Sequence, residues 1–151
     1  MKYEKVENWL CNELPFFQNQ GSKAYKEDLD NIKVLLKELK NPQNNLKCIH
    51  VAGTNGKGSV SFMLSNLLKN EGYNVGLFTS PHLLTFRERI QLNNDYIDKE
   101  SVVYFVKKYK SLNKLINFSF FEFITAMAFW FFAKKKVDIA IIECGLGGRL
   151  D

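Results

Sequence analysis

A glycine-rich segment, Gly53-Thr54-Asn55-Gly56-Lys57-Gly58-Ser59, has residue types that suit phosphate binding. Glycines allow consecutive backbone N–H groups to turn inward around phosphate oxygens, and a lysine adds a positive charge toward the β- and γ-phosphates. The segment follows a short apolar run and precedes a stretch with helical spacing, which is the context that such loops require. We therefore predict a nucleotide-phosphate loop here, in preference to a tight glycine turn beside a surface lysine.

The loop departs from the common pattern GxxxxGK[ST] at two positions. Val51 stands where the first glycine is expected, and Gly58 stands where serine or threonine follows the lysine. Because that hydroxyl normally binds Mg²⁺, another side chain must provide it. The candidates are Ser59 and Ser80, which follows the next predicted strand. Spacing alone also leaves Ser80 as an ordinary turn serine before Pro81.

Glu143 is the second residue with the chemistry of a magnesium ligand. It ends a strongly apolar run that begins at Val137. A carboxylate at the carboxyl end of a buried strand, beside a phosphate loop, resembles the acidic magnesium ligand of P-loop enzymes. The alternative is a glutamate that leaves the sheet for solvent, but with the loop upstream we favour the metal role.

Alternating strands and helices are predicted to position these residues. Short apolar runs at 47–52, 73–79 and 137–143 are typical of buried strands. The first two of these flank an expected helix whose apolar face comprises Val60, Met63, Leu64, Leu67 and Leu68. Strands that alternate with helices favour an α/β fold, here a three-layer P-loop-type domain with a mostly parallel sheet.

Further elements complete the predicted fold. We expect helices near 6–14, 29–39, 98–112 and 118–133, with Asp98 as an N-cap. Residues 89–97 alternate around Asn93-Asn94, which favours a hairpin. Because the strand at 137–143 needs a following element to cover it, we expect the fold to be truncated before its C-terminal elements. Some apolar surface should then be left bare.

Composition sets the class of protein. The chain has 151 residues, of which 46% are apolar and 25% charged, as in one soluble globular domain. Its net charge of +5 suits anionic ligands without identifying one. Three widely spaced cysteines predict neither a disulfide framework nor a zinc site. The apolar run at 118–133 contains Glu122 and is shorter than the roughly 20 residues of a membrane span. We expect a cytoplasmic monomer with no membrane or nucleic-acid partner.

Four segments occur in an order that resembles one known family. They are GTNGKGS at 53–59, TSPHL at 79–83 with FRERI at 86–90, FFEF at 120–123, and ECGLGGRLD at 143–151. Together they resemble the N-terminal ATPase domain of bacterial folylpolyglutamate synthase/dihydrofolate synthase, a relative of the Mur ligases. The resemblance covers nearly all of residues 1–151. It implies an incomplete Mur-ligase-like ATP-binding domain that lacks the C-terminal glutamate-ligase domain.

The resemblance also implies an activity. In such a ligase of folate biosynthesis, ATP phosphorylates a carboxylate of dihydropteroate or a folate, and the amine of glutamate displaces the phosphate. ATP and Mg²⁺ are the implied cofactors, and dihydropteroate or folate and glutamate are the implied partners. Family members are more than twice as long, so we expect this chain to be inactive by itself.

Individual roles follow from the same resemblance. It implies ATP binding by Asn55, Gly56, Lys57, Gly58 and Ser59, catalytic roles for Lys57 and Glu143, and magnesium binding by Ser80 and Glu143. It further implies substrate binding by Ser80, Ser119, Phe120, Phe121, Leu150 and Asp151. For the two phenylalanines a plain core role is an equal alternative. His82 and Arg87 lie in a matching segment, and neither is assigned a role.

Two other functions stay open. One is a Mur-type ligase with another carboxylate substrate, such as a UDP-muramoyl peptide, although Gly58 argues against it. The other is a nucleotide-binding remnant without catalytic activity.

Overall fold

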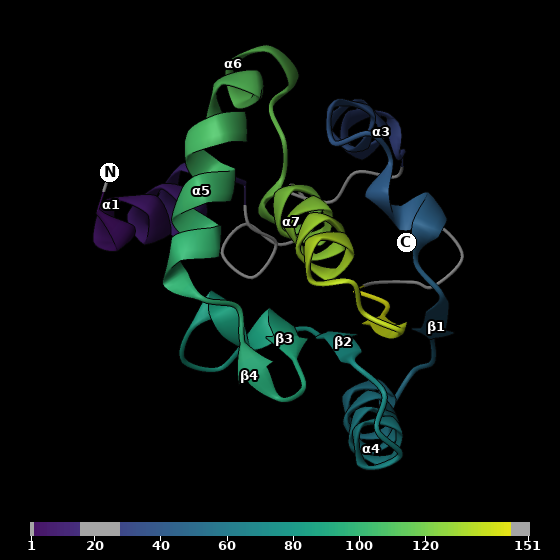
Figure 1. Cartoon of the computed structure of the whole chain (residues 1–151). Coiled ribbons are helices and arrows are strands. Elements are labelled where there is room, and N and C mark those ends of the chain that lie inside the picture. Colours follow the sequence, from purple (N-terminus) through teal and green to yellow (C-terminus); the bar gives the residue numbers. More distant parts are fainter. Residues whose placement is uncertain (1, 16–27, 146–151) are drawn as a thin grey trace. The chain divides into compact units, whose positions relative to one another are not determined.

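The computed structural model describes residues 2–15 and 28–145, which fall into two compact units (Figure 1). One unit comprises Met1–Asn41 with Asp98–Met127, and the other comprises Pro42–Ile97 with Ala128–Asp151. The described part of the first unit is helical, whereas the second is built around a sheet.

The helical unit contains seven described elements, of which the last continues into the sheet unit: α1 (Tyr3–Asn8), η1 (Trp9–Glu13), α3 (Asp30–Glu38), α5 (Lys99–Tyr109), η5 (Lys110–Leu112), α6 (Asn113–Ile116) and α7 (Phe120–Lys135). These elements confirm the helices expected near 6–14, 29–39, 98–112 and 118–133. An aromatic cluster forms the core of this unit. The ring of Phe123 packs edge-on against Trp9 and Phe105, at centroid distances of 5.2 and 5.3 Å.

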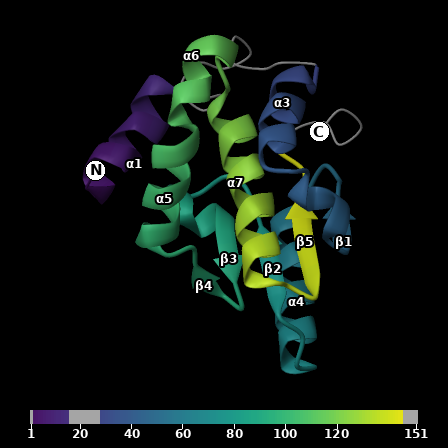
Figure 2. The same ribbon diagram turned by 45° about the horizontal axis from the view of Figure 1, so that its top comes forward.

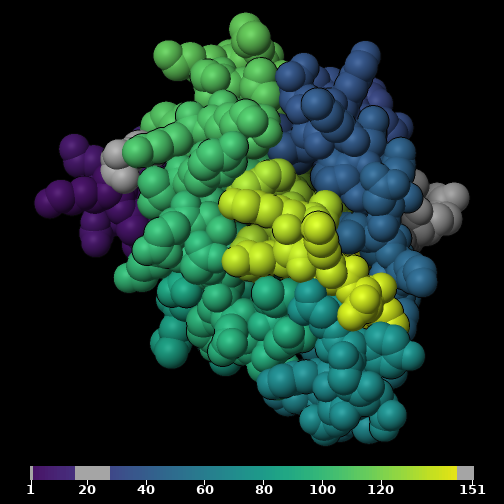
Figure 3. Space-filling view, viewed as in Figure 1, coloured from purple at the N-terminus to yellow at the C-terminus, as the bar shows by residue number. Residues whose placement is uncertain are grey.

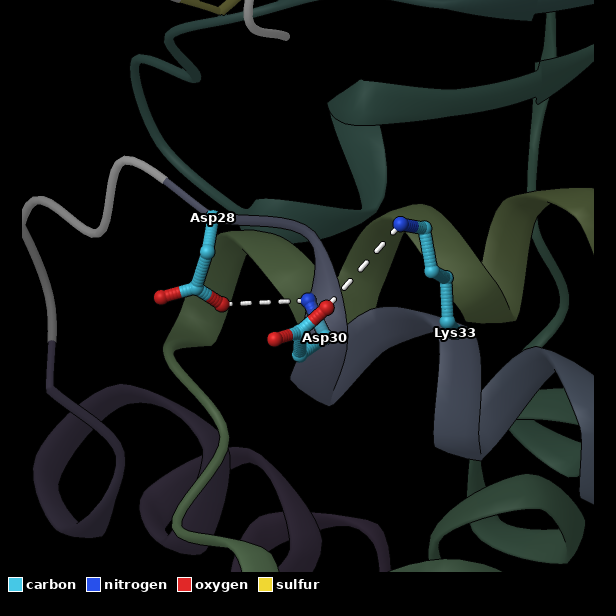
Figure 4. A network of polar contacts seen from close by, with 3 residues as sticks. All are labelled: Asp28, Asp30 and Lys33. Atoms are coloured by element: carbon cyan, nitrogen blue, oxygen red, sulfur yellow. Dashed lines mark hydrogen bonds and ion pairs between the residues drawn. The ribbon is translucent and has the colours of Figure 1, made fainter.

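Acidic side chains fix the starts of two helices in this unit. The Asp98 carboxylate accepts the backbone N–H of Ser101 at 2.6 Å, which confirms the predicted cap of α5. At the start of α3, the backbone N–H of Asp30 donates to the Asp28 carboxylate at 3.0 Å (Figure 4). Lys33 lies one turn on, with its ammonium 3.9 Å from the Asp30 carboxylate.

The sheet unit contains eight described elements besides the end of α7: η3 (Pro42–Asn45), β1 (Cys48–Val51), α4 (Lys57–Asn70), β2 (Val75–Phe78), η4 (Phe86–Arg89), β3 (Ile90–Leu92), β4 (Asp95–Tyr96) and β5 (Ile139–Glu143). The strand order is β1-β5-β2-β3-β4. Strands β1, β5 and β2 are parallel, and β3 and β4 add an antiparallel hairpin. This confirms the mostly parallel sheet, and the hairpin turns at Asn93-Asn94 as predicted, both with positive φ.

Helices cover both faces of this sheet, with α4 on one side and the last turns of α7 on the other (Figure 2). On the α7 side, Gly76 lets Phe132 approach closely, because a Cβ at Gly76 would lie 2.7 Å from the ring. On the α4 side, apolar residues of the strands and the helix pack together: Val51, Leu64, Leu68, Val75, Leu77 and Ile141. The predicted three layers are therefore present in the sheet unit.

Two expectations about burial were wrong. The strand expected to be buried at 47–52 is β1. It is an edge strand of the sheet, and its Ile49 is 37% exposed. Helix α4 turns Ser61 and Ser65, both fully buried, away from solvent, whereas Met63 and Leu67 are each 63% exposed. The physical reason is that the sheet covers only one side of α4, and no described residue covers the adjoining apolar side.

Helix α7 is the most apolar of the longer described helices. Its buried residues include Phe120, Phe123, Ile124, Met127 and Phe132, as expected for a helix packed in protein. No helix in the described residues is long and apolar enough to span a membrane.

Candidate functional site

The glycine-rich loop connects β1 to α4, as the sequence predicts. Gly56 precedes the first residue of the helix and has φ 77° and ψ 2°, a left-handed conformation that favours glycine. This turn reverses the chain so that α4 begins at Lys57 with its first N–H groups at the loop. Such N–H groups have no partner within the helix, and the helix dipole adds positive potential there. The loop therefore has the backbone geometry of an anion site.

Lys57 folds back over this loop. Its ammonium donates a hydrogen bond to the carbonyl oxygen of Gly53, at 2.8 Å. A lysine ammonium has three N–H donors, and this contact uses one of them. The positive charge of Lys57 therefore lies beside the loop, where it can bind a phosphate.

Three elements meet at the carboxylate of Glu143. The residue ends β5 and is only 4% exposed. The backbone N–H of Ser80, two residues after β2, donates to Glu143 Oε2 at 2.8 Å. On its other side, Glu143 Oε1 lies 3.5 Å from where a Cβ of Gly58 would stand, in the first turn of α4. The structure thus brings together Ser80, Gly58 and Glu143.

The strand register explains this meeting. Glu143 is paired with Val51 in β1, and the preceding Ile142 is paired with Phe78, the last residue of β2. Because parallel strands end at the same edge of a sheet, the residues that follow them converge there. Side chains also alternate along β5, so Glu143 lies on the same face as Ile141, which packs toward α4.

The donors at this place suit a hard cation. Glu143 is a buried carboxylate, and no lysine or arginine among residues 2–15 and 28–145 forms an ion pair with it. Burial of an uncompensated carboxylate is costly, which favours a cation beside it. Mg²⁺ binds few protein oxygens and keeps waters and phosphate oxygens as its other ligands. A carboxylate, a serine and a neighbouring phosphate loop therefore fit this ion, although the described residues hold no cluster of three or more acidic, His or Cys ligands.

The segment after Ser80 is shaped by a residue that sequence reasoning missed. The Glu88 carboxylate accepts the backbone N–H groups of Leu83, Leu84 and Thr85, each at 2.8 Å. These hydrogen bonds hold the pKa of Glu88 below its ordinary value, and the bond from Leu83 has the largest effect. The spacing of residues 86–90 (FRERI) does not predict this role, because the role depends on how the loop folds back onto η4.

Arg89 supports the same segment from inside. It is 3% exposed, and its Nε donates to Nδ1 of His82 at 2.8 Å. Burial, with the Arg89 charge adding to it, lowers the pKa of His82, so the ring is neutral at pH 7. Because Nδ1 accepts this bond, the proton of the neutral ring lies on Nε2. Arg87 instead donates to the carbonyl of Ile97, at 2.6 Å.

We predict that Glu88→Gln destabilises the sheet unit in a pH-dependent way. A carboxyl whose folded pKa is depressed stabilises the fold above its unfolded pKa, and the effect disappears as pH falls through the folded pKa. The variant should unfold at a lower urea concentration than the parent at pH 7, and this difference should become smaller at acidic pH, as the lowered pKa of Glu88 is approached. Urea titrations at neutral and acidic pH, with Glu71→Gln as an exposed control, check this. An offset that is equal at both pH values would contradict it.

The predicted substrate residues are placed differently. Ser119 and Phe120 lie in the helical unit, where Ser119 caps α7: its hydroxyl accepts the backbone N–H of Glu122 at 3.2 Å, and its own N–H donates to Glu122 Oε2 at 2.7 Å. Phe120 is fully buried, and Phe121 is half-buried. Leu150 and Asp151 lie outside the described residues. The substrate roles of these residues thus remain predictions.

Comparisons with known proteins agree with the sequence resemblance. No model of a known protein family matches the chain. A dihydrofolate synthase/folylpolyglutamate synthase of Bacillus subtilis is 37% identical over 156 residues, which cover 99% of this chain and 35% of the relative. The crystal structure of a folylpolyglutamate synthase from Thermotoga maritima has 46% identity and a TM-score of 0.85, covering 99% of this chain and 34% of that one.

A second similar structure carries ligands. It is a folylpolyglutamate synthase complex with AMPPCP and folate, with 36% identity and a TM-score of 0.88 over 100% of this chain and 37% of that one. The chain therefore spans about a third of the length of each of these three proteins. Over that third, the chain is a homologue of the folylpolyglutamate synthase/dihydrofolate synthase family.

Proposed function

We propose that this chain forms the ATP-binding part of a ligase that joins L-glutamate to a carboxylate of dihydropteroate or a folate. The observation that carries the proposal is the Glu143 carboxylate, held between the N–H of Ser80 and the first turn of α4, beside the Lys57 loop. The similar structure with AMPPCP, an ATP analogue, and folate supports this ligand class.

The reaction consists of two displacements. A carboxylate oxygen of the substrate attacks the γ-phosphorus of ATP, the bond to the bridging oxygen breaks, and ADP leaves with that electron pair. The amine of glutamate then attacks the acyl carbon, the bond from that carbon to the phosphate oxygen breaks, and the amine loses a proton. The products are an amide and inorganic phosphate. Both steps depend on aligned reactants and on stabilisation of developing charge.

The residues of the site have distinct roles in this proposal. The N–H groups of residues 55–59 and the Lys57 ammonium bind the phosphates, and the ammonium exchanges its Gly53 contact for a phosphate oxygen. Ser80, through its hydroxyl, and Glu143 would hold Mg²⁺, which neutralises phosphate charge when bound. Ser119, Phe120, Phe121, Leu150 and Asp151 are the residues that this proposal assigns to binding of the carboxylate substrate.

A chimaeric enzyme tests this function. In it, the present chain replaces the matching third of the Bacillus subtilis relative, and phosphate release is measured with ATP, dihydropteroate and glutamate. We expect release by the chimaera and none by the isolated chain. A folded chimaera that releases no phosphate with dihydropteroate or folates would remove the assignment. Glutamate ligation by the isolated chain would refute its predicted inactivity.

A further inference from the structure

Asn55 and Gly56, in the glycine-rich loop, are the one Asn-Gly pair in the sequence. In such a pair, the backbone nitrogen of the glycine can attack the side-chain amide carbon of the asparagine, because glycine has no side chain that hinders the approach. A cyclic imide forms and ammonia is lost. The pair therefore has the composition of a site of spontaneous deamidation.

The surroundings of Asn55 leave this attack open. Asn55 and Gly56 are both exposed, and the loop leads into α4, which forms one border of the sheet unit in the space-filling view (Figure 3). Among residues 2–15 and 28–145, no hydrogen bond uses the Asn55 side-chain amide or the N–H of Gly56. Apart from its chain neighbours, no described residue has a heavy atom within 4 Å of where a Cβ of Gly56 would stand. Within the described part of the chain, neither packing nor a hydrogen bond holds the two reacting groups apart.

The asparagines of the hairpin turn are held differently. Asn93 Oδ1 accepts the backbone N–H of Val75 at 2.8 Å, and its Nδ2 donates to Asn74 Oδ1 at 2.9 Å. Asn94 Nδ2 donates to Asn66 Oδ1 at 2.8 Å. These bonds fix the side-chain amides, and neither residue precedes a glycine. The hairpin turn therefore provides an internal reference for Asn55.

The electrostatic potential at the loop favours the attack on Asn55. Gly56 immediately precedes α4, a helix of 14 residues, at the end where the helix dipole is positive. The Lys57 ammonium, 2.8 Å from the carbonyl oxygen of Gly53, adds a full positive charge. Positive potential stabilises both the deprotonated nitrogen of Gly56 and the negative oxygen of the tetrahedral intermediate. The arrangement that suits a phosphate thus also suits this reaction.

We propose that Asn55 is a deamidation site through which the phosphate loop inactivates itself when no nucleotide is bound. The N–H of Gly56 gives its proton to hydroxide, and the nitrogen forms a bond to Asn55 Cγ. The bond from Cγ to the side-chain nitrogen then breaks, and ammonia leaves with a proton taken from water. Water opens the imide at either of its carbonyls, which gives aspartate or its β-linked isomer. One water is consumed and one ammonia released.

Either product opposes phosphate binding. The new carboxylate places a negative charge in the loop, where it repels phosphate oxygens. The β-linked isomer also adds a methylene group to the backbone, which displaces the N–H groups of residues 56–59. A bound phosphate would in turn protect Asn55, because an oxygen that accepts the N–H of Gly56 keeps the proton on that nitrogen. This protection rests on the proposed function, whereas the reaction of the nucleotide-free loop does not.

Mass spectrometry of tryptic peptides tests the reaction. The full chain is kept in mildly alkaline buffer without nucleotide, and a sample digested at the start corrects for conversion during digestion. Peptide 48–57 contains Asn55 as its only asparagine, and peptide 90–99 contains Asn93 and Asn94. Peptide 48–57 should gain the mass of an –NH2 to –OH exchange about tenfold faster than peptide 90–99, or more, because only Asn55 precedes glycine.

Two references make this test decisive. A synthetic peptide with the sequence of residues 48–57 gives the rate of the sequence without the fold. If the chain stays unmodified while that peptide is converted, the folded loop holds the reacting groups apart and the inference is overturned. Asn55→Gln, whose longer side chain would need a larger ring, should show almost no conversion. A mass shift that persists in this variant would place the reaction elsewhere and also overturn the inference.

Nucleotide binding tests the consequence. Saturating AMPPCP with Mg²⁺ should slow the conversion of Asn55 and leave peptide 90–99 unaffected. Converted chain, separated by ion exchange, should bind AMPPCP about tenfold more weakly than unconverted chain, or worse, because like charges repel, and Asn55→Asp should reproduce the loss. Equal affinities of the converted and unconverted chains would overturn the self-inactivation. Conversion of a chain that binds no AMPPCP would contradict the proposed function and leave the modification site established.

Discussion

Lys57→Ala is expected to reduce the affinity of the chain for AMPPCP by about tenfold to a hundredfold. A hydrogen bond to a charged group contributes about 1.5–3 kcal/mol, and tenfold in affinity corresponds to about 1.4 kcal/mol. The lysine has its ammonium 2.8 Å from the Gly53 carbonyl, so it lies at the loop before any nucleotide arrives. Isothermal titration calorimetry at high nucleotide concentration measures the change.

The control for this variant is Lys69→Ala. Lys69 is an exposed lysine in the last turn of the same helix, so its removal changes the net charge equally without touching the loop. We expect its affinity for AMPPCP to stay within twofold of the parent. Lys57→Ala should also leave the urea midpoint almost unchanged, because a half-exposed side chain with one loop contact contributes little to stability. Equal affinities of the two variants would exclude Lys57 from phosphate binding.

Much of the sheet unit could be predicted because local patterns determine it. The hairpin at Asn93-Asn94 forms because two residues with positive φ suit its turn. Ser80 and Glu143 could be expected at one sheet edge because Ser80 follows one parallel strand and Glu143 ends another, and the structure joins them by one hydrogen bond. Their roles in metal binding stay predictions, since proximity alone does not show a ligand.

Other features depend on contacts that no local pattern contains. A short apolar run has the same appearance in a central strand and at an edge, so the exposure of Ile49 in β1 could not be inferred. Helical spacing identified the apolar residues of α4 but not the side that the sheet would cover. Glu88 and Arg89 act through a loop that folds back on them, and their importance follows only from the hydrogen bonds of the folded chain.

Glu143→Gln is expected to remove the effect of Mg²⁺ on nucleotide binding. In the parent chain, Mg²⁺ should raise the affinity for AMPPCP about tenfold or more, because a carboxylate and phosphate oxygens would share the ion. The glutamine keeps an oxygen that can accept the N–H of Ser80, but it lacks the negative charge. Titrations with and without Mg²⁺ give the ratio, which should fall to nearly one in the variant. Glu71→Gln, in the same unit, should keep it.

Ser80→Ala distinguishes the hydroxyl from the backbone of the same residue. The backbone N–H that holds Glu143 remains in this variant, so a loss of magnesium dependence would belong to the hydroxyl. If both side chains bind one ion, the effects of Ser80→Ala and Glu143→Gln will not add in the double variant. Additive effects would show two separate functions.

The stability of Glu143→Gln without metal distinguishes a metal ligand from a purely structural residue. A buried carboxylate without a cation costs free energy, so in magnesium-free buffer Glu143→Gln should be at least as stable to urea as the parent. If the carboxylate instead supported the fold through its bond to Ser80, replacing the charged acceptor by a neutral amide would weaken that bond and cost the variant about 1 kcal/mol. A less stable variant with unchanged magnesium dependence would therefore make Glu143 a structural residue and end its assignment as a metal ligand.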